Sequence, residues 1–554
     1  MTDKIHPSSI KLHKKILKPQ NKEFAWIKHH YIQLIIIAII VYAIIYSVLV
    51  SIGPAKTGDD MAYAGLAIQT IHGAFHETNY IYTVRFLQVF PIAFFYEILG
   101  VNGFSSAAWD ITSFVLSVII AYFLGKELYN KKVGLIAALL MCFFPLVLQY
   151  TGTMSDDTPV MMFVSLTILA LLYARKRNSK KWYFASGALV ISAPLVTPLG
   201  FIIIPFLAGY LAIELLRRKL SINRITLYFV VGLLFSGILL MIINYILSGN
   251  PLITITLNGY YYSQVGTPGF ATAGALAGPL YYVHVIFPYN LSSLLYNAAM
   301  GKNVSVSNLF ENNVAGFFFY AFIICTAYLI AKRERRAYLP LLWFTIMFVY
   351  LSVGPEYITL KPFYYLLMIR LNRYLLPIAI PVVIIISMGV ARFIEDEKRQ
   401  KRKIIRIIFS SLAIIFIITM SIPLNLFWYH TKIVTEYDMQ QIGYYISNLP
   451  NTTKIFYLNG LSEVIVFSGA QNPNRFYAYD QISNCSALPT GAYVVVPKYV
   501  EYYNLAYTPN PSNYCPGWKL VLYPRLDENF STAVTGQGIV FRAKLYYIEQ
   551  NNSK

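Results

Sequence analysis

The stretch Lys56-Thr57-Gly58-Asp59-Asp60-Met61-Ala62-Tyr63 places two adjacent carboxylates directly after the first long apolar run of the chain. Carboxylates are costly to hold next to lipid, so the pair predicts either a water-filled cleft or a fully solvated loop. The apolar residues that follow recur at helical spacing, which predicts a helix lying on the membrane with the acidic pair in its first turn. A cleft would make the pair a candidate for catalysis. The alternative is a helix cap, because carboxylates stabilise helix N-termini.

The composition is that of a polytopic membrane protein. The 554 residues are 57% hydrophobic and only 13% charged, and the mean hydropathy is +0.53. The net charge of +20 is carried by short basic clusters between apolar runs. This distribution is typical of membrane orientation signals and does not indicate a nucleic-acid partner. We therefore expect a multi-pass protein of the plasma membrane, with the lipid bilayer as its surroundings.

Eleven apolar runs predict membrane spans. A further run at 86–99 is only about fourteen residues long and contains Gln88, Pro91 and Glu97, which predicts an interfacial or re-entrant segment. With that run outside the count, the N-terminal tail and the basic loops fall on one side, which the positive-inside rule makes cytoplasmic. The predicted spans are 31–52, 105–125, 133–151, 158–174, 182–195, 198–216, 225–247, 314–331, 338–353, 374–394 and 404–424.

This topology divides the chain into three parts. Residues 1–30 form a basic cytoplasmic N-terminal tail, and residues 31–424 form an all-α transmembrane domain. Residues 425–554 form a small extracytoplasmic domain, in which a helical pattern at 436–448 precedes strand-like segments, so we expect an α/β arrangement. These segments are 454–458, 463–467, 492–496, 519–522 and 539–547. The predicted outward loops of the membrane domain are 54–104, 152–158, 249–313 and 354–373.

Two cysteines lie in the predicted outer domain, Cys485 and Cys515. On an outer membrane face they predict a disulfide, with two unpaired thiols as the alternative. The sequence contains no Cys/His metal-ligand pattern, phosphate-binding glycine loop or nucleophile elbow. The candidate chemistry therefore rests on the carboxylates and the cations near them.

A second acidic pair, Asp156-Asp157, ends the outward loop between the third and fourth predicted spans of the membrane domain. Two outward loops that each carry an acidic pair where a helix begins can converge on one cleft. The alternative is a pair of independent caps, because Ser155 and Asp156 are good cap residues and Pro159 suits a first helical turn.

Cations precede the tenth predicted span on the same outer side, at Lys361, Arg370 and Arg373, with Tyr374 next to the last of them. Guanidinium and ammonium groups at this depth can bind a lipid phosphate. Long basic side chains at the end of a span also extend to the interface without any ligand. Both interpretations stay open from the sequence.

Together these motifs resemble the GT-C superfamily of membrane glycosyltransferases, in the branch of protein O-mannosyltransferases and aminoarabinose transferases. The first outer loop is similar to that family's Asp-acid-x-x-Tyr through Asp59, Asp60 and Tyr63. The second acidic loop and the Arg-Tyr-Leu-x-Pro sequence at 373–377 are similar as well, and the resemblance covers about the first 430 residues. The tail lacks a Trp-Trp-Asp sequence, which argues against the oligosaccharyltransferase branch.

The resemblance implies inverting transfer of a sugar from a polyprenyl-phosphate donor to a hydroxyl of a protein, lipid or glycan. Asp59 and Asp60 would form the catalytic pair, with Asp59 as the base that deprotonates the acceptor. Substrate positioning, or binding of a divalent cation such as Mg²⁺ or Mn²⁺, is expected from Tyr63, Asp156 and Asp157. Neutralisation of the lipid phosphate is expected from Arg85, Lys361, Arg373 and Tyr374.

Two other classes of protein fit the same residues. A transporter or lipid flippase would use them to line a path, although transporters commonly place ionisable groups near the bilayer midplane. A catalytically silent assembly subunit would leave the two acidic pairs far apart. Convergence of the outer loops would favour transfer over both alternatives.

Overall fold

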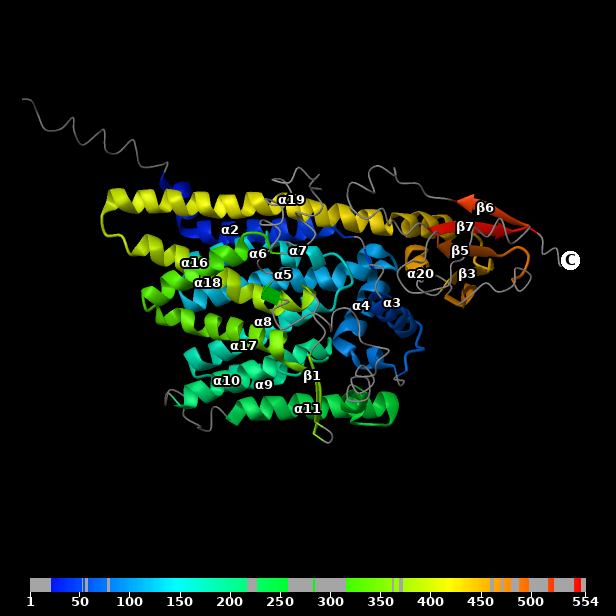
Figure 1. The fold of residues 1–554 in the computed structure, drawn as a ribbon, viewed down its shortest axis with the longest axis horizontal. Helices are drawn as coiled ribbons and strands as arrows, with labels where there is room; N and C mark the ends of the chain where they lie inside the picture. Colours follow the sequence, from blue (N-terminus) through cyan, green and yellow to red (C-terminus); the bar gives the residue numbers. More distant parts are fainter. Residues whose placement is uncertain are drawn as a thin grey trace, which may run out of the picture.

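The protein is described by a computed structural model. It describes residues 21–51, 53–54, 58–76, 80–216, 227–257, 282–283, 315–360, 363–367, 372–458, 463–469, 473–479, 488–497, 517–522 and 543–549. In this part of the chain, long helices lie side by side along one direction, and a small sheet domain lies at one end of them (Figure 1). The predicted fold class, a helical membrane domain followed by a small α/β domain, is confirmed.

Most helices of the membrane domain correspond to predicted spans. They are α2 (Asn21–Leu49), α5 (Gly103–Leu128), α6 (Lys131–Met141), α7 (Pro145–Tyr150), α8 (Asp157–Arg177), α9 (Lys180–Leu189), α10 (Ile203–Leu216), α11 (Leu227–Ser248), α16 (Phe318–Ala331), α17 (Tyr338–Val353), α18 (Ala379–Glu395) and α19 (Gln400–Ser447). Short 3₁₀ turns at η2 (Pro198–Ile202), η3 (Arg335–Ala337) and η4 (Asn372–Ile378) lead into three of them. Among the described residues, seven helical segments are long and apolar enough to cross a membrane, and three shorter apolar helices accompany them.

The core of the bundle lies around α8 and α18. Every residue of α18 from Ala379 to Gly389 is buried, and α8 is buried along most of its length. A helix that is apolar on all sides is stable only when other helices surround it, which explains this central position. By contrast, most side chains of α11 that are large and apolar are exposed, as expected for a helix that faces lipid.

Basic segments distant in the sequence meet at one end of the bundle. Arg175 at the end of α8 pairs with Glu214 of α10 at 2.7 Å, and Lys332 after α16 pairs with Asp396 after α18 at 2.9 Å. The convergence agrees with the prediction that the basic loops share one membrane face. The cytoplasmic assignment of that face stays a prediction from the charge distribution.

The opposite end carries two short helices, α3 (Gly58–Ile71) and α4 (Phe86–Leu99), linked in part by the 3₁₀ turn η1 (Ile81–Val84). They pack on each other and lie near the C-terminal domain (Figure 1). With 14 residues, α4 is too short to cross a bilayer upright, in agreement with the predicted interfacial segment. A two-stranded antiparallel hairpin, β1 (Pro355–Leu360) and β2 (Phe363–Leu367), precedes η4.

The C-terminal domain is a five-stranded mixed sheet covered by helix. Its strand order is β4-β3-β5-β7-β6, with β3 parallel to β4 and β5, and β7 antiparallel to β5 and β6. Met439, Ile442 and Ile446 of α19 pack against the sheet, so the membrane helix itself forms part of this domain's core. The remaining elements are β3 (Ile455–Leu458), α20 (Glu463–Phe467), η5 (Pro473–Arg475), β4 (Phe476–Tyr479), β5 (Tyr493–Pro497), β6 (Trp518–Leu522) and β7 (Ala543–Ile548).

Three details differ from the sequence prediction. The run 133–151 is two helices, because Pro145 has no backbone N–H to continue the first one and instead starts α7. The expected strand at 463–467 is the helix α20. Gln400–Ser447 is one helix of 48 residues, so the last predicted span and the helix at 436–448 are continuous through Pro423.

Close packing of α9 on α11 depends on two glycines. A Cβ at Gly232 of α11 would lie 2.0 Å from the carbonyl oxygen of Phe184, and one at Gly187 of α9 would lie 1.9 Å from that of Phe229. Small residues of this kind allow two helix backbones to approach closely in a membrane.

We expect Gly232→Ala to separate α9 from α11 and to lower the thermal unfolding temperature of the protein in detergent, with a cost of about 1–3 kcal/mol from overpacking. Gly237→Ala on the same helix is the matched control, because a Cβ there meets only the side chain of Ile191 at 3.7 Å. Equal unfolding temperatures for the two variants would contradict this account of the interface.

Candidate active site

The loops that carry the two acidic pairs are joined through their backbones. Gly53 and Thr153 form a parallel β-bridge, and the Gly53 N–H donates to the Gly152 carbonyl oxygen at 3.4 Å. Both glycines have positive φ angles, +96° and +80°, a conformation that other residues rarely adopt. The bridge fixes the starts of α3 and α8 relative to each other.

A buried carboxylate of α5 supports this junction. Asp110 is 1% exposed, and its Oδ2 accepts a hydrogen bond from the Gly152 N–H at 2.9 Å. Because an unpaired buried N–H is costly, this contact favours the turn that precedes Asp156 and Asp157. Asp110 therefore acts as a positioning residue for the second acidic pair.

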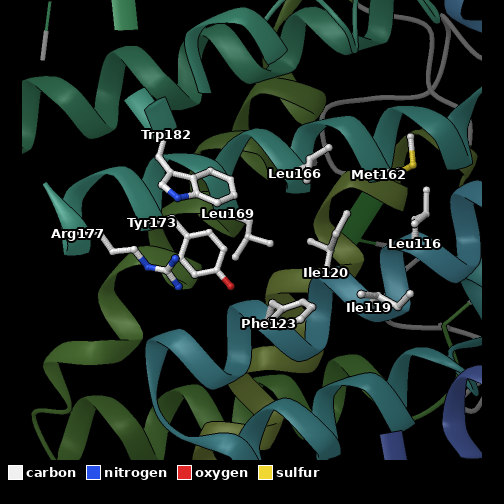
Figure 2. Close-up of a pocket in the computed structure, with 10 residues that line it drawn as sticks. All are labelled: Leu116, Ile119, Ile120, Phe123, Met162, Leu166, Leu169, Tyr173, Arg177 and Trp182. Atoms are coloured by element: carbon white, nitrogen blue, oxygen red, sulfur yellow. The ribbon is translucent and has the colours of Figure 1, made fainter. Parts of the chain in front are cut away.

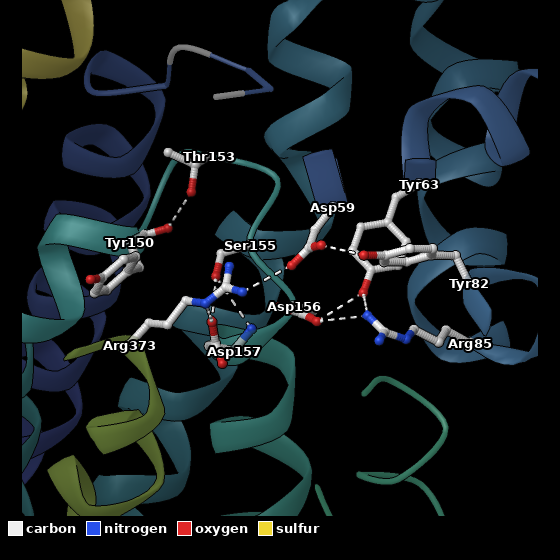
Figure 3. Close-up of polar contacts among 10 residues, drawn as sticks. All are labelled: Asp59, Tyr63, Tyr82, Arg85, Tyr150, Thr153, Ser155, Asp156, Asp157 and Arg373. Atoms are coloured by element: carbon white, nitrogen blue, oxygen red, sulfur yellow. Dashed lines mark hydrogen bonds and ion pairs between the residues drawn. The ribbon is translucent and has the colours of Figure 1, made fainter. Parts of the chain in front are cut away.

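Arg373 lies between carboxylates from the two loops (Figure 3). Its Nη2 is 2.9 Å from Asp59 Oδ2, and its Nε is 3.2 Å from Asp157 Oδ2. Asp59 comes from the first turn of α3, Asp157 from the first residue of α8, and Arg373 from η4 at the entrance to α18. Three segments that are far apart in the sequence thus converge on one guanidinium group.

A second cationic group stands beside the first. Arg85 Nη1 lies 3.3 Å from Asp156 Oδ2, and the Tyr63 hydroxyl donates to the same oxygen at 2.8 Å. The Arg85 guanidinium also donates to the Tyr63 hydroxyl and lies 4.4 Å from the ring centroid of Tyr82. The Tyr82 hydroxyl in turn donates to Asp59 Oδ1, so this residue connects the two cationic groups.

The side chain of Asp156 does not cap helix α8, although its position in the sequence allows that role. Asp156 is the N-cap residue of α8, yet its side chain makes no capping hydrogen bond and contacts Tyr63 and Arg85 instead. Asp157 receives a local contact from Ser155, whose Oγ lies 3.3 Å from Asp157 Oδ2. The pair therefore faces the cluster around Arg373 and Arg85.

The other predicted site residues have different positions. Asp60 is 3% exposed in the first turn of α3, and its catalytic role stays a prediction. The ring of Tyr374 lies 5.8 Å from the Arg373 guanidinium, so it packs on the cation. Lys361, and the predicted disulfide partners Cys485 and Cys515, lie outside the described residues.

Burial and charge act in opposite directions on Asp59. Burial alone would raise the pKa of its carboxyl, but Arg373, the hydrogen bond from Tyr82 and the charge of Arg85 lower that pKa below its ordinary value. Burial raises the pKa of the Tyr63 hydroxyl well above its usual value. At neutral pH, Asp59 is therefore ionised and Tyr63 is a hydrogen-bond donor.

One carboxylate of the cluster is more accessible to a substrate than the others. The Asp59 side chain is 29% exposed, whereas those of Asp156 and Asp157 are 5% and 1% exposed. A group that takes a proton from a substrate must come within hydrogen-bond distance of it. In this conformation, Asp59 meets that condition better than the other two carboxylates.

The carboxylates near the predicted site of a divalent cation pair with arginines in this structure. Within the described ranges, no group of three or more His, Cys, Asp or Glu side chains gathers to hold a metal ion. The guanidinium of Arg373 already pairs with both Asp59 and Asp157. A cation bound to the predicted ligands Asp156 and Asp157 would lie beside the guanidinium groups of Arg85 and Arg373. Binding of a divalent cation stays a prediction from the sequence.

Two contributors to the site were not identified from the sequence, Tyr82 and Asp110. Tyr82 gives no signal alone, because many tyrosines occur in the outer loops. Asp110 could have been found, since an ionisable residue inside a predicted span is a candidate for function or for a specific partner.

Asp110→Leu removes the acceptor for the Gly152 N–H, and we expect it to displace the second acidic loop and to lower any activity of the site at least tenfold. Asp110→Asn retains a side-chain oxygen as acceptor and should keep most of that activity. The measurement is turnover of the two purified variants, with circular dichroism to verify the helical fold. Equal turnover of the leucine variant and the unmodified protein would exclude the positioning role.

Comparison with known proteins relates part of the sequence to a family. Residues 86–243, less than a third of the chain, match the family described as dolichyl-phosphate-mannose-protein mannosyltransferase. No curated protein sequence gave a significant match.

Solved structures with the same fold are available. The apo oligosaccharyltransferase of Archaeoglobus fulgidus matches with a TM-score of 0.53 and 13% identity, over 85% of this chain and 70% of that one. ArnT from Cupriavidus metallidurans bound to undecaprenyl phosphate matches with a TM-score of 0.54 and 12% identity, over 93% and 97% of the two chains. Archaeoglobus fulgidus AglB, in complex with an inhibitory peptide and a dolichol-phosphate, matches with a TM-score of 0.50 and 14% identity, over 80% and 64%. The chain therefore shares the fold of these oligosaccharyltransferase and ArnT structures, and residues 86–243 match the model of the mannosyltransferase family.

Proposed function

We propose that this multi-pass membrane protein is an inverting glycosyltransferase that moves a sugar from a polyprenyl-phosphate donor to a hydroxyl group of a protein, lipid or glycan acceptor. The observation that carries the proposal is the convergence of Asp59 and Asp157 on Arg373, with Asp59 partly exposed. An accessible carboxylate beside a cation provides the two groups that this reaction needs. The solved relatives support the donor class, because the matched ArnT structure contains undecaprenyl phosphate and the AglB structure contains a dolichol-phosphate.

In the proposed reaction, Asp59 removes the proton of the acceptor hydroxyl while the acceptor oxygen attacks the anomeric carbon. The bond from that carbon to the phosphate oxygen breaks, and the polyprenyl phosphate leaves with the electron pair. Attack opposite the leaving group inverts the anomeric configuration. A phosphate is a good leaving group, so a separate general acid is not required.

Of the two arginines in the described cluster, Arg373 is the better placed to bind the departing phosphate. Its side chain is 18% exposed, whereas that of Arg85 is 9% exposed and lies against Tyr63, Tyr82 and Asp156. A guanidinium stabilises negative charge that develops in the transition state. We assign Arg85 to holding the buried Tyr63 and Asp156 in place beside Asp59.

Donor binding has a consequence for the base. As long as Arg373 pairs with Asp59, the pKa of Asp59 is low and the carboxylate is a weak base. A donor phosphate that attracts the guanidinium weakens this pair. Asp59 then becomes more basic when the donor is bound, which links proton removal to the presence of the leaving group.

The arrangement of charges argues against the transporter alternative. The central helix α18 carries no charged residue between its start and Arg392, and α8 carries none between Asp157 and Arg175. Transport of a polar substrate past these helices would require polar groups near the bilayer midplane. The silent-scaffold alternative predicts separated acidic pairs, whereas Asp59 and Asp157 contact the same guanidinium.

The test of this function is sugar transfer by the purified protein from a labelled polyprenyl-phosphate sugar, with donors and hydroxyl acceptors supplied in turn. We expect Asp59→Asn to lower turnover by about 10²–10⁴-fold, the usual contribution of a general base. Asp396→Asn is the matched control, because this carboxylate pairs with Lys332 and Arg392 at the other end of the bundle. Unchanged turnover in Asp59→Asn would remove Asp59 from the role of base.

The pKa of Asp59 also predicts a difference between two pH profiles. Asp59 must be ionised to act, so the rate is lost as the pH falls through its pKa, which in the free protein lies below the ordinary 3.8. Release of Arg373 raises this pKa in the donor complex. We therefore expect the acid limb of kcat, which reports the complex, at a higher pH than that of kcat/KM, which reports the free protein. Coinciding limbs would show that the donor leaves the pair intact.

A further inference from the structure

An apolar groove opens on the membrane domain and runs along α8, away from the end that carries the carboxylate cluster. It has a volume of about 440 Å³ and lies between α5, α8 and α9. Leu116, at its α5 wall, is 40% exposed, so the groove opens sideways toward lipid. The lining residues, hereafter the lateral groove, are Leu116, Ile119, Ile120, Phe123, Met162, Leu166, Leu169, Tyr173, Arg177 and Trp182.

One end of the lateral groove is cationic and aromatic, and the rest is apolar. Figure 2 shows Arg177, Tyr173 and Trp182 gathered at one end, with Met162 and Leu116 at the other. The Arg177 guanidinium lies 4.4 Å from the ring centroid of Tyr173, whose ring is 4.9 Å from that of Trp182. This combination is typical of the boundary between lipid tails and headgroups.

Arg177 differs from the two basic residues that precede it. Arg175 pairs with Glu214 at 2.7 Å and Lys176 with Glu127 at 3.4 Å. No acidic side chain in the described part of the chain forms an ion pair with the exposed Arg177. Its charge is therefore available to an anion from outside the protein, at the membrane face where the basic loops gather.

The length of the groove corresponds to one lipid leaflet. From Tyr173 to Met162, helix α8 rises about 16 Å, at 1.5 Å per residue. The hydrocarbon core of a bilayer is about 30 Å thick, so each leaflet accounts for about 15 Å. An acyl chain that enters beside Arg177 would therefore reach the far end of the groove near the bilayer midplane.

The position of Arg177 shows that an anion bound to it is not the phosphate of the glycosyl donor. The 21 residues of α8 place Arg177 about 30 Å from Asp157 along the helix. The proposed donor phosphate lies at the Asp157 end, beside Arg373. A donor molecule bound there would present no phosphate to Arg177.

We propose that the lateral groove binds one acyl chain of an anionic diacyl phospholipid from the leaflet next to the basic loops, with the lipid phosphate on Arg177. The apolar wall contacts the chain, and the guanidinium provides the selection for negative headgroups. Basic pockets between membrane helices commonly bind anionic lipid headgroups in this way. The proposal does not depend on the catalytic function, because none of the lining residues contacts the carboxylate cluster.

Trp182 provides a direct probe, since bromine on an acyl chain quenches the fluorescence of a tryptophan that it contacts. The delipidated full chain in detergent is titrated with phosphatidylglycerol brominated near the headgroup end of its acyl chains, and the Trp182 signal is obtained by difference from Trp182→Phe. We expect saturable quenching of this signal. Phosphatidylcholine with the same brominated chains should bind about fivefold more weakly, the effect of one cation near the membrane surface.

Two variants test the residues. Arg177→Gln should weaken phosphatidylglycerol binding about fivefold and leave the phosphatidylcholine titration unchanged, while Leu166→Phe should fill the groove and abolish the quenching. Lys131→Gln is the matched control, because Lys131 is an exposed cation at the same end of the bundle and does not line the groove. This variant should leave both lipid titrations unchanged.

Three results would overturn the proposal. One is equal quenching by the two brominated lipids with no effect of Arg177→Gln. Another is absence of quenching in a protein that elutes as a single species in gel filtration. The third is loss of the phosphatidylglycerol signal when undecaprenyl phosphate is added, which would assign the groove to the tail of the donor. Since Arg177 is exposed, Arg177→Gln should fold. Its lipid titrations therefore test the proposal even if Leu166→Phe does not fold.

Discussion

The site depends on one shared guanidinium. Asp59 and Asp157 belong to different loops, and without Arg373 between them their charges would repel in a partly buried environment. Removing one partner of a buried ion pair typically costs about 3–5 kcal/mol, because the remaining charge stays buried without compensation. The two loops are therefore held together by a cation that a donor phosphate can also attract. This competition is the physical link between the resting structure and the proposed reaction.

The rest of the fold holds this contact in place. Arg373 lies in η4 at the entrance to α18, a helix whose residues from Ala379 to Gly389 are all buried. The carboxylates stand on the first turns of α3 and α8, where the helix dipoles favour negative charge. The C-terminal domain contacts the same end, since Val466 of α20 shares a core with α3 and α4. An apolar bundle thus supplies rigidity, and the polar chemistry is confined to one of its ends.

Much of this organisation could be predicted from the sequence, for identifiable reasons. Long apolar runs and basic clusters indicate spans and sides without tertiary information. The outward position of both acidic pairs made their convergence one of two interpretations, with independent helix caps as the other, and the pairing of both carboxylates with Arg373 was not predicted. The contact of Tyr82 with Asp59 and the support of Gly152 by Asp110 depend on how α3, η1 and α5 pack, which residue spacing does not encode. The strand prediction at 463–467 was wrong because a short apolar run has no periodicity that separates strand from helix.

The most direct test of the central claim is an experimental structure of the protein with a polyprenyl phosphate bound. The account predicts that the lipid phosphate lies within hydrogen-bond distance of the Arg373 guanidinium, that the 2.9 Å contact from Arg373 Nη2 to Asp59 Oδ2 is lengthened, and that Asp59 faces the space beside the phosphate. A phosphate bound elsewhere, with Arg373 still paired to both Asp59 and Asp157, would contradict it.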